Sequence, residues 1–273
     1  MNLQTILITG ATDGVGKCAA IDIAKKDACL LLHGRNKEKL NKVIEEIKSL
    51  TGNQNIEGFV ADFSSMNDVR QLSKDVLATH DKIDVLINNA GVGFAASRYG
   101  KDGTELRLAV NYLAPFLLTN LLLPAIKKGA PSRIVNVSSA GQSPVNFDDI
   151  MMEKNFDAVT AYCQSKLALI MFTFDLAGEL KEYNITVNAL HPGTYLDTNM
   201  VRNANIAPQG TPQSGADAEI FLATSPEFKN VSGKYFNVKK EAKANAQAYD
   251  AKARKQLKEL SLQLTGLKET VGK

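Results

Sequence analysis

Short β-rich apolar runs alternate with longer helical patterns along almost all of this 273-residue chain. Continuous apolar runs predict strands that are buried on both faces of a sheet. We expect strands at residues 3–9, 28–33, 57–61, 83–87, 133–137, 185–190 and 233–236, the last of them at a sheet edge. We expect helices at residues 17–26, 37–49, 106–126, 160–180, 216–224 and 242–264, and another that begins near Met66. Such alternation requires a parallel sheet with helices on both faces, so the sequence predicts one doubly wound α/β domain over residues 1–273.

A glycine-rich turn follows the first expected strand and opens the first expected helix. Its sequence is Thr9-Gly10-Ala11-Thr12-Asp13-Gly14-Val15-Gly16. Glycines allow a tight turn, and the start of a helix offers free N–H groups and a positive dipole end to a pyrophosphate. A turn without a ligand is the structural alternative. The residues that we expect to contact a dinucleotide here are Gly10, Thr12, Asp13, Gly14, Val15 and Gly16.

The second expected strand ends at Gly34-Arg35-Asn36, where a dinucleotide-binding unit meets the adenosine ribose. An acidic side chain at this point accepts a hydrogen bond from the 2′-hydroxyl of NAD. Here Gly34 takes that place, and the guanidinium of Arg35 can form charge-assisted bonds to a 2′-phosphate. We therefore expect NADP(H), contacted by Arg35 and Asn36; the alternative is an ordinary surface arginine in a loop.

Tyr162 and Lys166 open the apolar run 167–180 and are four residues apart, so a helix places them on the same face. A phenol titrates near pH ~10, too high for proton transfer at neutral pH. An ammonium beside it favours the phenolate, so we expect Lys166 to lower the pKa of Tyr162. On their own the two residues match an ordinary helix surface equally well.

Five motifs in order resemble the short-chain dehydrogenase/reductase family, in the branch that contains the retinol dehydrogenases. They are the TGxxxGxG loop at residues 9–16, Asn88-Asn89-Ala90-Gly91 after the fourth strand, Asn111 in the long apolar helix, Ser138-Ser139 after the fifth strand, and the pair Tyr162 and Lys166. The branch is indicated by His33-Gly34-Arg35-Asn36, by residues 133–139 and by Ala161-Tyr162-Cys163. The resemblance covers nearly the whole chain and implies a Rossmann fold.

The resemblance also implies hydride transfer between NADP(H) and a carbonyl or alcohol substrate. Tyr162 would be the general acid/base, Lys166 would bind the nicotinamide ribose, Ser139 (with Ser138 as the fallback) would bond the substrate oxygen, and Asn111 would hold a water. The further cofactor contacts that it implies are Asp62 and Phe63 at the adenine, Asn89, Ala90 and Gly91 beside the adenosine ribose, Pro192 and Gly193 beneath the nicotinamide, and Thr198 at the carboxamide or a phosphate. Asp62 is alternatively a cap for the helix that begins near Met66.

Two segments bear on the substrate, for which we expect a small, apolar molecule. The connection 141–159 is long, and its Met151, Met152 and Phe156 either line an apolar pocket or pack as core. Residues 194–213 have no clear periodicity, and we expect a lid over the substrate there. They begin Thr194-Tyr195-Leu196, without the aromatic-then-basic turn usual in the family, so substrate contacts cannot be transferred.

Two other functions fit the same fold. One is a light-dependent reductase of the protochlorophyllide type, which shares the tyrosine–lysine pair. The other is a non-catalytic nucleotide-sensing protein, although every expected catalytic position is filled. We expect no N-terminal hydrophobic anchor of the kind that membrane-bound relatives carry, so retinoid chemistry is not implied.

Composition narrows the partners and the compartment. The net charge of +3 is too mild to indicate a nucleic-acid partner. The three cysteines and three histidines form no zinc or disulfide pattern, so we expect no metal and a reducing, cytoplasmic setting without a signal peptide. The basic helical tail predicts a solvated helix face, with a membrane-surface role as the alternative.

The stretch 106–126 has membrane-spanning length but contains Arg107, Asn111 and Pro115, so we expect a buried helix and no membrane span. Apolar positions that we take as outward-facing favour a homodimer or homotetramer. They are Leu117, Leu121, Leu169 and Phe172.

Overall fold

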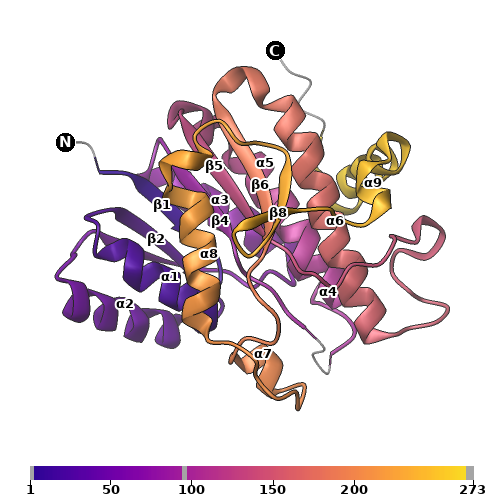
Figure 1. Ribbon diagram of the computed structural model, residues 1–273, viewed down its shortest axis with the longest axis horizontal. Helices are drawn as coiled ribbons and strands as arrows, with labels where there is room; N and C mark the ends of the chain where they lie inside the picture. The colour runs from indigo at the N-terminus through magenta and orange to yellow at the C-terminus, as the bar shows by residue number, and fades with distance from the viewer. Residues whose placement is uncertain (1–2, 94–96, 269–273) are drawn as a thin grey trace.

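The centre of the computed structural model, which describes residues 3–93 and 97–268, is an eight-stranded sheet (Figure 1). Its strands are β1 (Thr5–Ile8), β2 (Cys29–Gly34), β3 (Ile56–Val60), β4 (Val85–Asn88), β5 (Ser132–Val137), β6 (Ile185–His191), β7 (Lys234–Asn237) and β8 (Lys240–Ala242). They lie in the order β3-β2-β1-β4-β5-β6-β7-β8. Every neighbouring pair is parallel except β7 and β8, which confirms the predicted doubly wound sheet.

The first strand shows why continuous apolar runs form the middle of this sheet. All four residues of β1 are buried, with Ile6 and Ile8 in one core layer and Leu7 in the other. Ile6 pairs with Leu30 of β2 on one side and with Val85 of β4 on the other. The strand order reverses at β1 and β4, and α/β sheets bind ligands at the carboxyl ends of the strands at such a point.

Helices cover both faces of the sheet (Figure 1). One face carries α1 (Gly14–Ala24), α2 (Lys37–Thr51) and α8 (Pro212–Thr224). The other carries α3 (Met66–Thr79), α5 (Ala114–Lys128) and α6 (Ala158–Glu179). The shorter or terminal helices are α4 (Leu106–Leu108), α7 (Asn199–Arg202) and α9 (Ala251–Thr265).

Side-chain caps set the starts of α2 and α3. The Asn36 and Ser65 side chains each accept a hydrogen bond from the backbone N–H three residues further on. Asp62 is therefore not the cap of the third helix, because Ser65 occupies the position directly before Met66.

The C-terminal region differs from the prediction in two respects. Residues 233–236 are not at the sheet edge, because β8 pairs antiparallel with β7 outside it. The helix expected over 242–264 begins only at Ala251, where the Asp250 carboxylate accepts from two backbone N–H groups. Pairing with β7 keeps Lys240–Ala242 extended, and helical periodicity along the sequence contains no information about that partner.

The long apolar helix expected over 106–126 is interrupted by a π-helical turn, Ala109–Leu113, between α4 and α5. Turns of this kind are frequent at functional sites, and this one contains Asn111. The stretch Leu106–Lys128 is long and apolar enough to cross a membrane, but 78% of its most apolar window is buried inside the fold. Core packing therefore accounts for its apolar character.

The apolar positions that favour an oligomer do not form an exposed face. Three of the four, Leu117, Leu169 and Phe172, are buried in the core of the chain itself, and Leu121 is partly buried against that core. The prediction treated them as outward-facing, whereas all four pack in or against the core of this chain.

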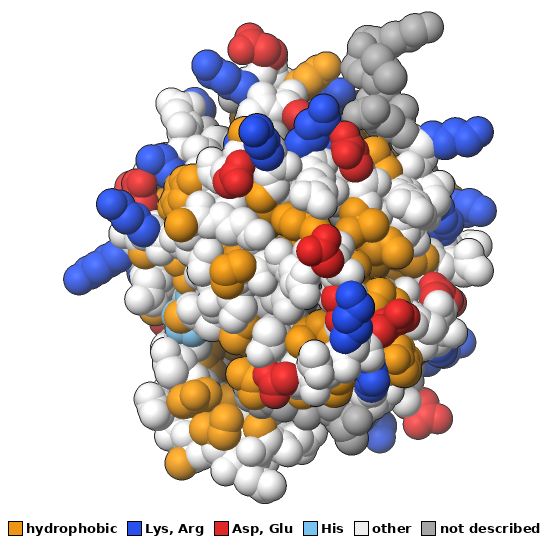
Figure 2. Space-filling model, turned by 90° about the vertical axis from the view of Figure 1, so that its right-hand side faces the viewer, with side chains coloured by type: hydrophobic (Ala, Val, Ile, Leu, Met, Phe, Trp, Pro, Cys, Tyr) orange, Lys and Arg blue, Asp and Glu red, His pale blue; other side chains and the backbone are white. Residues whose placement is uncertain are grey.

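Helix α9 packs on α6 and on the π turn, on the side of the molecule that faces the viewer in Figure 2. Leu257 belongs to the main core cluster, and Ser261 Oγ lies 2.5 Å from the Tyr112 hydroxyl. Arg254 Nε donates to Asp175 Oδ1 at 2.5 Å. Figure 2 shows basic and acidic side chains interspersed among apolar ones on this side. Apolar contacts and ion pairs together fix the terminal helix to the domain.

We expect Leu257→Ala to lower the free energy of unfolding by about 2–5 kcal/mol, the usual cost of a cavity in a core. Leu257 is only 1% exposed, so its removal leaves space between α9 and the domain. Urea unfolding followed by circular dichroism measures the change. Gln263→Ala, at an exposed position of the same helix, is the control. Equal effects of the two substitutions would contradict a core role for α9.

Candidate active site

The four predicted catalytic residues come from three parts of the chain and meet above the carboxyl ends of β4 and β5. Ser139 follows β5, Tyr162 and Lys166 lie in α6, and Asn111 lies in the π turn before α5. In the sequence, Asn111 and Lys166 are far apart. The fold places them within one small region, as the contacts of each residue demonstrate.

The two serines that follow β5 have different partners. Ser138 Oγ donates to the carbonyl of Lys166 at 2.7 Å and so ties β5 to α6. Ser139 Oγ accepts from the N–H of Gly141 at 3.0 Å and is hydrogen-bonded to Tyr162. Of the two candidates, Ser139 is therefore the one beside the tyrosine.

The pKa of Tyr162 is raised, whereas the sequence predicts that Lys166 lowers it. Burial is the main cause because it disfavours the phenolate, and the hydrogen bond to Ser139 acts in the opposite direction. Lys166 is close, with Nζ 5.8 Å from the centre of the Tyr162 ring, but it does not outweigh burial. The phenol therefore keeps its proton at neutral pH.

Lys166 is buried, and its Nζ donates to the carbonyl oxygen of Val137 at 2.8 Å. Burial lowers the pKa of Lys166 to about 8, and the charge of Glu219 partly opposes this shift. With a pKa of 8 the ammonium form dominates at pH 7 by roughly ten to one. A methyl group on Gly91 would lie 3.4 Å from Nζ, so the lysine also borders the Asn-Asn-Ala-Gly turn.

Asn111 joins this turn to α6. Its Oδ1 accepts from the N–H of Val92 at 2.8 Å, and its Nδ2 donates to the Val92 carbonyl and to Ser165 Oγ, each at 3.0 Å. A methyl group on Gly91 would lie 3.2 Å from Oδ1. Asn111 therefore fixes the backbone that leads from β4 into the site.

The glycine loop packs directly against the Asn-Asn-Ala-Gly turn. Asn89 Nδ2 donates to the carbonyls of Thr9 and Gly10 at 2.8 and 3.1 Å. Gly10 has a φ of +69°, and a methyl group there would lie 2.7 Å from Ala90 Cα. A methyl group on Gly16 would lie 2.3 Å from Asn89 Nδ2. Both positions require glycine, because a side chain would push the two turns apart.

Helix α1 begins at Gly14, within the glycine loop, with Val15 and Gly16 buried in its first turn. Asp13 caps it, with Oδ1 accepting from the Gly14 N–H at 2.7 Å. The other carboxylate oxygen accepts from Asn199 Nδ2 and so ties the loop to α7. The N-terminus of α1 fits a pyrophosphate through its backbone and dipole, whereas the Asp13 carboxylate is engaged with protein groups.

The end of β2 lies beside the glycine loop. A methyl group on Gly34 would lie 2.4 Å from Thr12 Cγ2, so glycine at this point allows the close approach. Arg35 is exposed, and Asn36 caps α2. A glycine in place of an acid, next to an exposed guanidinium, fits the 2′-phosphate of NADP(H).

Phe63, which follows β3, stacks on His33 with ring centroids 4.1 Å apart. His33 Nδ1 accepts from the Gly10 N–H at 3.2 Å, and Nε2 lies 3.0 Å from the Ala61 carbonyl oxygen. Burial lowers the pKa of His33 to about 4, so the ring is neutral and Nε2 carries the hydrogen. His33 therefore helps to hold the glycine loop in place through its hydrogen bond with the Gly10 N–H.

Asp62 comes directly before Phe63 in the chain and is partly buried. Its Oδ1 accepts from the Ser64 N–H at 3.0 Å, and its Oδ2 lies 3.2 Å from Lys101 Nζ. Burial acts to raise the pKa of Asp62, but the bonds from Ser64 and Lys101 outweigh it and hold the pKa below its ordinary value. The carboxylate is therefore ionised and available as an acceptor.

The expected lid, residues 194–213, folds back on the glycine loop. It follows Pro192 and Gly193. Gly193 has a φ of +143°, and a methyl group placed on it would lie 2.9 Å from Leu196 Cδ2, so the absence of a side chain leaves space for Leu196. Thr198 lies directly before α7, and its Cγ2 would lie 3.0 Å from a methyl group on Gly14. The segment thus contains α7 and the first two residues of α8, and it contacts the start of α1.

The three residues of the connection before α6 that were considered for an apolar pocket lie in different environments. Met152 is buried, and Gln164 Nε2 donates to its sulfur at 3.6 Å. Met151 packs against the core from a partly buried position, whereas Phe156 is 37% exposed, with the Arg98 guanidinium 4.8 Å from its ring centre. Met152 is therefore core, and Phe156 lies at the surface.

Three further residues bear on the site, and the sequence does not single them out. The Ser139 carbonyl accepts from the Tyr235 hydroxyl at 3.0 Å and from Gln142 Nε2 at 2.9 Å. Glu219 in α8 is buried and interacts electrostatically with Lys166. No local pattern links Tyr235 or Gln142 to the serine. The signal for Glu219 is an acidic side chain among apolar residues of an expected helix.

A dinucleotide-binding α/β fold with a serine, a tyrosine and a lysine at the carboxyl edge of its sheet defines a class of nicotinamide-dependent oxidoreductases. The family model of the short chain dehydrogenases matches residues 4–209. Retinol dehydrogenase 13 of Mus musculus is 36% identical over 97% of this chain and 84% of its own, and retinol dehydrogenase 11 of Homo sapiens is 37% identical over 97% and 86%. A solved short chain dehydrogenase from Escherichia coli CFT073, complexed with NADPH, superposes with a TM-score of 0.70 and 29% identity over 87% of this chain and 97% of its own.

The chain belongs to the short chain dehydrogenase family. Within it, the relatives place the chain with the retinol-dehydrogenase branch, which confirms the resemblance drawn from the motifs.

Proposed function

We propose that this protein is an NADP(H)-dependent oxidoreductase that transfers a hydride between the nicotinamide and an apolar carbonyl or alcohol substrate. The observation that carries the proposal is the meeting of Ser139, Tyr162 and Lys166 beside the Asn-Asn-Ala-Gly turn, which packs against the glycine loop. An exposed Arg35 and the NADPH of a structural neighbour support the choice of NADP(H). Two relatives are named for retinol, an apolar alcohol, which supports the substrate class.

Tyr162 and Ser139 act on the substrate oxygen. When bound, NADPH supplies the hydride. In carbonyl reduction Tyr162 donates its phenolic proton to the oxygen, and the Ser139 hydroxyl hydrogen-bonds the same atom as negative charge develops. Because burial raises the pKa of Tyr162, the phenol carries the required proton at neutral pH. Alcohol oxidation needs the phenolate instead, so we expect that direction to gain from alkaline conditions.

Lys166 and Asn111 support the proton transfer. The Lys166 ammonium stabilises negative charge on Tyr162 as the proton leaves, and it binds the hydroxyls of the nicotinamide ribose. Asn111 Oδ1 accepts from the Val92 N–H and keeps a second lone pair for the water that resupplies the proton.

The test is NADPH consumption with a panel of apolar aldehydes and ketones that includes retinaldehyde, followed by absorbance. We expect consumption in the dark. Consumption only with protochlorophyllide under illumination would instead support a light-dependent reductase. Tight NADPH binding with no consumption under any condition would support a nucleotide-sensing protein and overturn the proposal.

We expect Arg35→Ala to weaken NADPH binding about 10- to 100-fold, the worth of charge-assisted bonds to a phosphate, and to change NADH binding little. The guanidinium is exposed next to Gly34 and can form charge-assisted bonds only with the cofactor that carries a 2′-phosphate. Fluorescence titration with both cofactors measures the ratio. Lys42→Ala, an exposed cation of α2, controls for general electrostatic attraction. An equal loss for both cofactors would refute the phosphate role.

A further inference from the structure

Glu219 is a buried carboxyl group that forms no hydrogen bond with any described residue. Its side chain is 0% exposed, and both Oε1 and Oε2 are without a partner in the described part of the chain. Burying an ionised carboxylate in this way is strongly unfavourable unless a charge compensates it. Most acidic residues of α/β domains lie at the surface, so the position of Glu219 requires an explanation.

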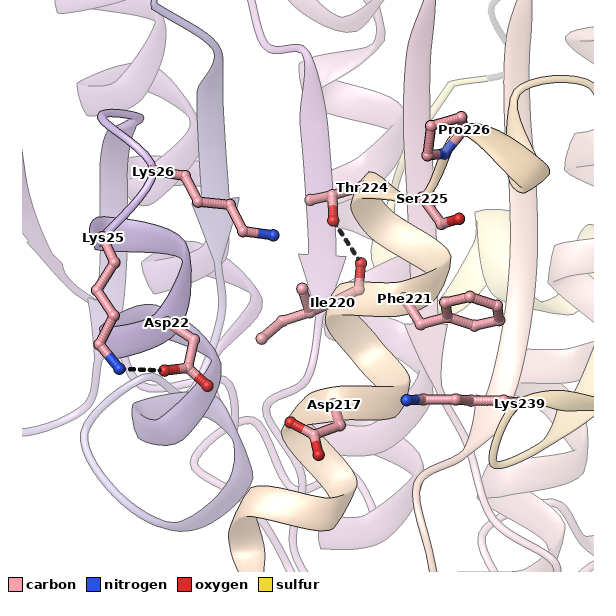
Figure 3. A pocket seen from close by; sticks show the side chains of 10 residues that line it. All are labelled: Asp22, Lys25, Lys26, Asp217, Ile220, Phe221, Thr224, Ser225, Pro226 and Lys239. Carbon is pink, nitrogen blue, oxygen red and sulfur yellow. Dashed lines mark hydrogen bonds and ion pairs between the residues drawn. The ribbon is translucent and has the colours of Figure 1, made fainter.

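Helix α8 directs Glu219 towards the inside of the domain. Figure 3 shows Asp217 and Phe221 of α8 at an outer groove that Asp22 and Lys25 of α1 also line. Residues two positions away on a helix lie about 200° around its axis, so Glu219 faces away from this groove. Because α8 packs on α1, β4, β5 and β6, that direction leads to the sheet. Helical side chains also lean towards the N-terminus of their helix.

Lys166 is the charge that Glu219 meets. Lys166 Nζ bonds the Val137 carbonyl at the end of β5, which is one of the strands on which α8 packs, and both side chains are buried. The charge of each group shifts the pKa of the other. From α1, Cys18 also senses Glu219, but its thiol is uncharged at neutral pH because burial raises its pKa. His191 at the end of β6 interacts with Lys166, and burial lowers its pKa, so it is neutral as well.

The other charged groups of the surrounding elements are engaged elsewhere. In α1, Lys17 pairs with Glu46 at 2.8 Å. In β5, Arg133 Nη1 donates to the carbonyls of Leu222 and Ser225, at the far end of α8. Lys166 is thus the ionic counterpart of Glu219 among the described groups that face it.

We propose that Glu219 is a positioning residue whose carboxylate is the buried counter-charge that keeps Lys166 in its ammonium form at alkaline pH. The inference rests on the proposed function, in which the ammonium assists Tyr162. Burial raises the pKa of Glu219 to about 8 and lowers the pKa of Lys166 to about 8. The carboxylate therefore acquires its charge in the range in which the lysine would otherwise lose its proton.

The test compares the wild type with Glu219→Gln, which keeps the shape of the side chain and removes its charge, and with Glu219→Leu as a second uncharged variant. Asp217→Asn, an exposed carboxylate of the same helix, is the matched control. The first readout is the Lys166 titration midpoint, followed by carbon NMR in lysine-labelled protein. The second is the alkaline limb of kcat/KM for carbonyl reduction.

We expect both uncharged variants to lower the Lys166 midpoint by about one pH unit, a usual effect of losing a nearby opposite charge. The alkaline limb should move to lower pH by a similar amount, and Asp217→Asn should move neither. An unchanged Lys166 midpoint in the variants that fold overturns the proposal, even if their stability changes. Absence of turnover in the wild type counts against the proposed function alone, because the NMR midpoint requires no substrate.

Discussion

Tyr162→Phe should reduce turnover by about 10²- to 10⁴-fold, the usual contribution of a positioned general acid. NADPH affinity should stay nearly unchanged, because the substitution removes one hydroxyl and leaves the glycine loop and Arg35 intact. Ser139 and Lys166 would retain their backbone partners, Gly141 and Val137. The loss would therefore appear in kcat and not in cofactor binding.

Steady-state NADPH oxidation with the best substrate of the panel measures the effect, and fluorescence titration measures the affinity. Tyr183→Phe is a matched control, because Tyr183 is 41% exposed and lies just beyond the distal end of α6. Activity of Tyr162→Phe close to that of this control would remove Tyr162 from the mechanism. Loss of NADPH affinity together with turnover would indicate a structural defect instead.

Glu219→Gln should stabilise the folded protein at neutral pH by an amount on the order of 3–5 kcal/mol. This is the free energy that corresponds to the upward shift of the Glu219 pKa on folding. Burial raises the pKa of Glu219 from 4.5 to about 8, so the folded state holds its proton more tightly than the unfolded state does. Wild-type stability must then fall as the pH rises from about 4.5 to about 8. The glutamine variant has no such proton to lose.

Two other buried groups contribute in different directions. The pKa of His33 falls to about 4 in the folded state, so its contribution to stability increases between about pH 4 and 6.5. Lys166 has a folded pKa of about 8, so its contribution increases between about pH 8 and 10.5. The His33 contribution cancels in the difference between variant and wild type, and in the wild type the Lys166 window lies above that of Glu219.

Urea unfolding at a series of pH values from 4 to 9 gives this difference directly, with Asp217→Asn as the control. The stability gain of Glu219→Gln should be near zero around pH 4 and should grow with pH up to about 8. A gain that is constant across the range would mean that folding does not change the pKa of the carboxyl group. A loss of stability at neutral pH would contradict a raised pKa of Glu219 in the folded state.

The order of elements and the motifs were predictable because both depend on short stretches of sequence. Alternating apolar runs and helical patterns predict the parallel sheet, and Gly10 and Gly16 mark the close contact with Asn89 and Ala90. The choice between Ser138 and Ser139 required the structure, because it depends on which hydroxyl faces α6 and which faces Tyr162.

The wrong predictions at the C-terminus also concern features that depend on contacts between segments far apart in the sequence. A helical pattern describes one segment, whereas the extended form of Lys240–Ala242 depends on its pairing with β7. Likewise, Phe172 lies at an apolar position of α6 that we expected to face an oligomer partner, but it belongs to the core, and α9 arrives from far along the chain to pack on the same helix. Long-range pairing and packing decide such cases.

By itself, the sequence determined the fold class, the glycine loop and the family, because periodicity and local motifs encode them. Only the tertiary structure decided the protonation of the site. It partly buries Tyr162 and so raises a pKa that the adjacent Lys166 was expected to lower, and it brings Glu219 from α8 within electrostatic reach of that lysine. The physical reason is that desolvation and charge–charge interactions depend on what surrounds a group in space, which residue spacing along the chain does not specify.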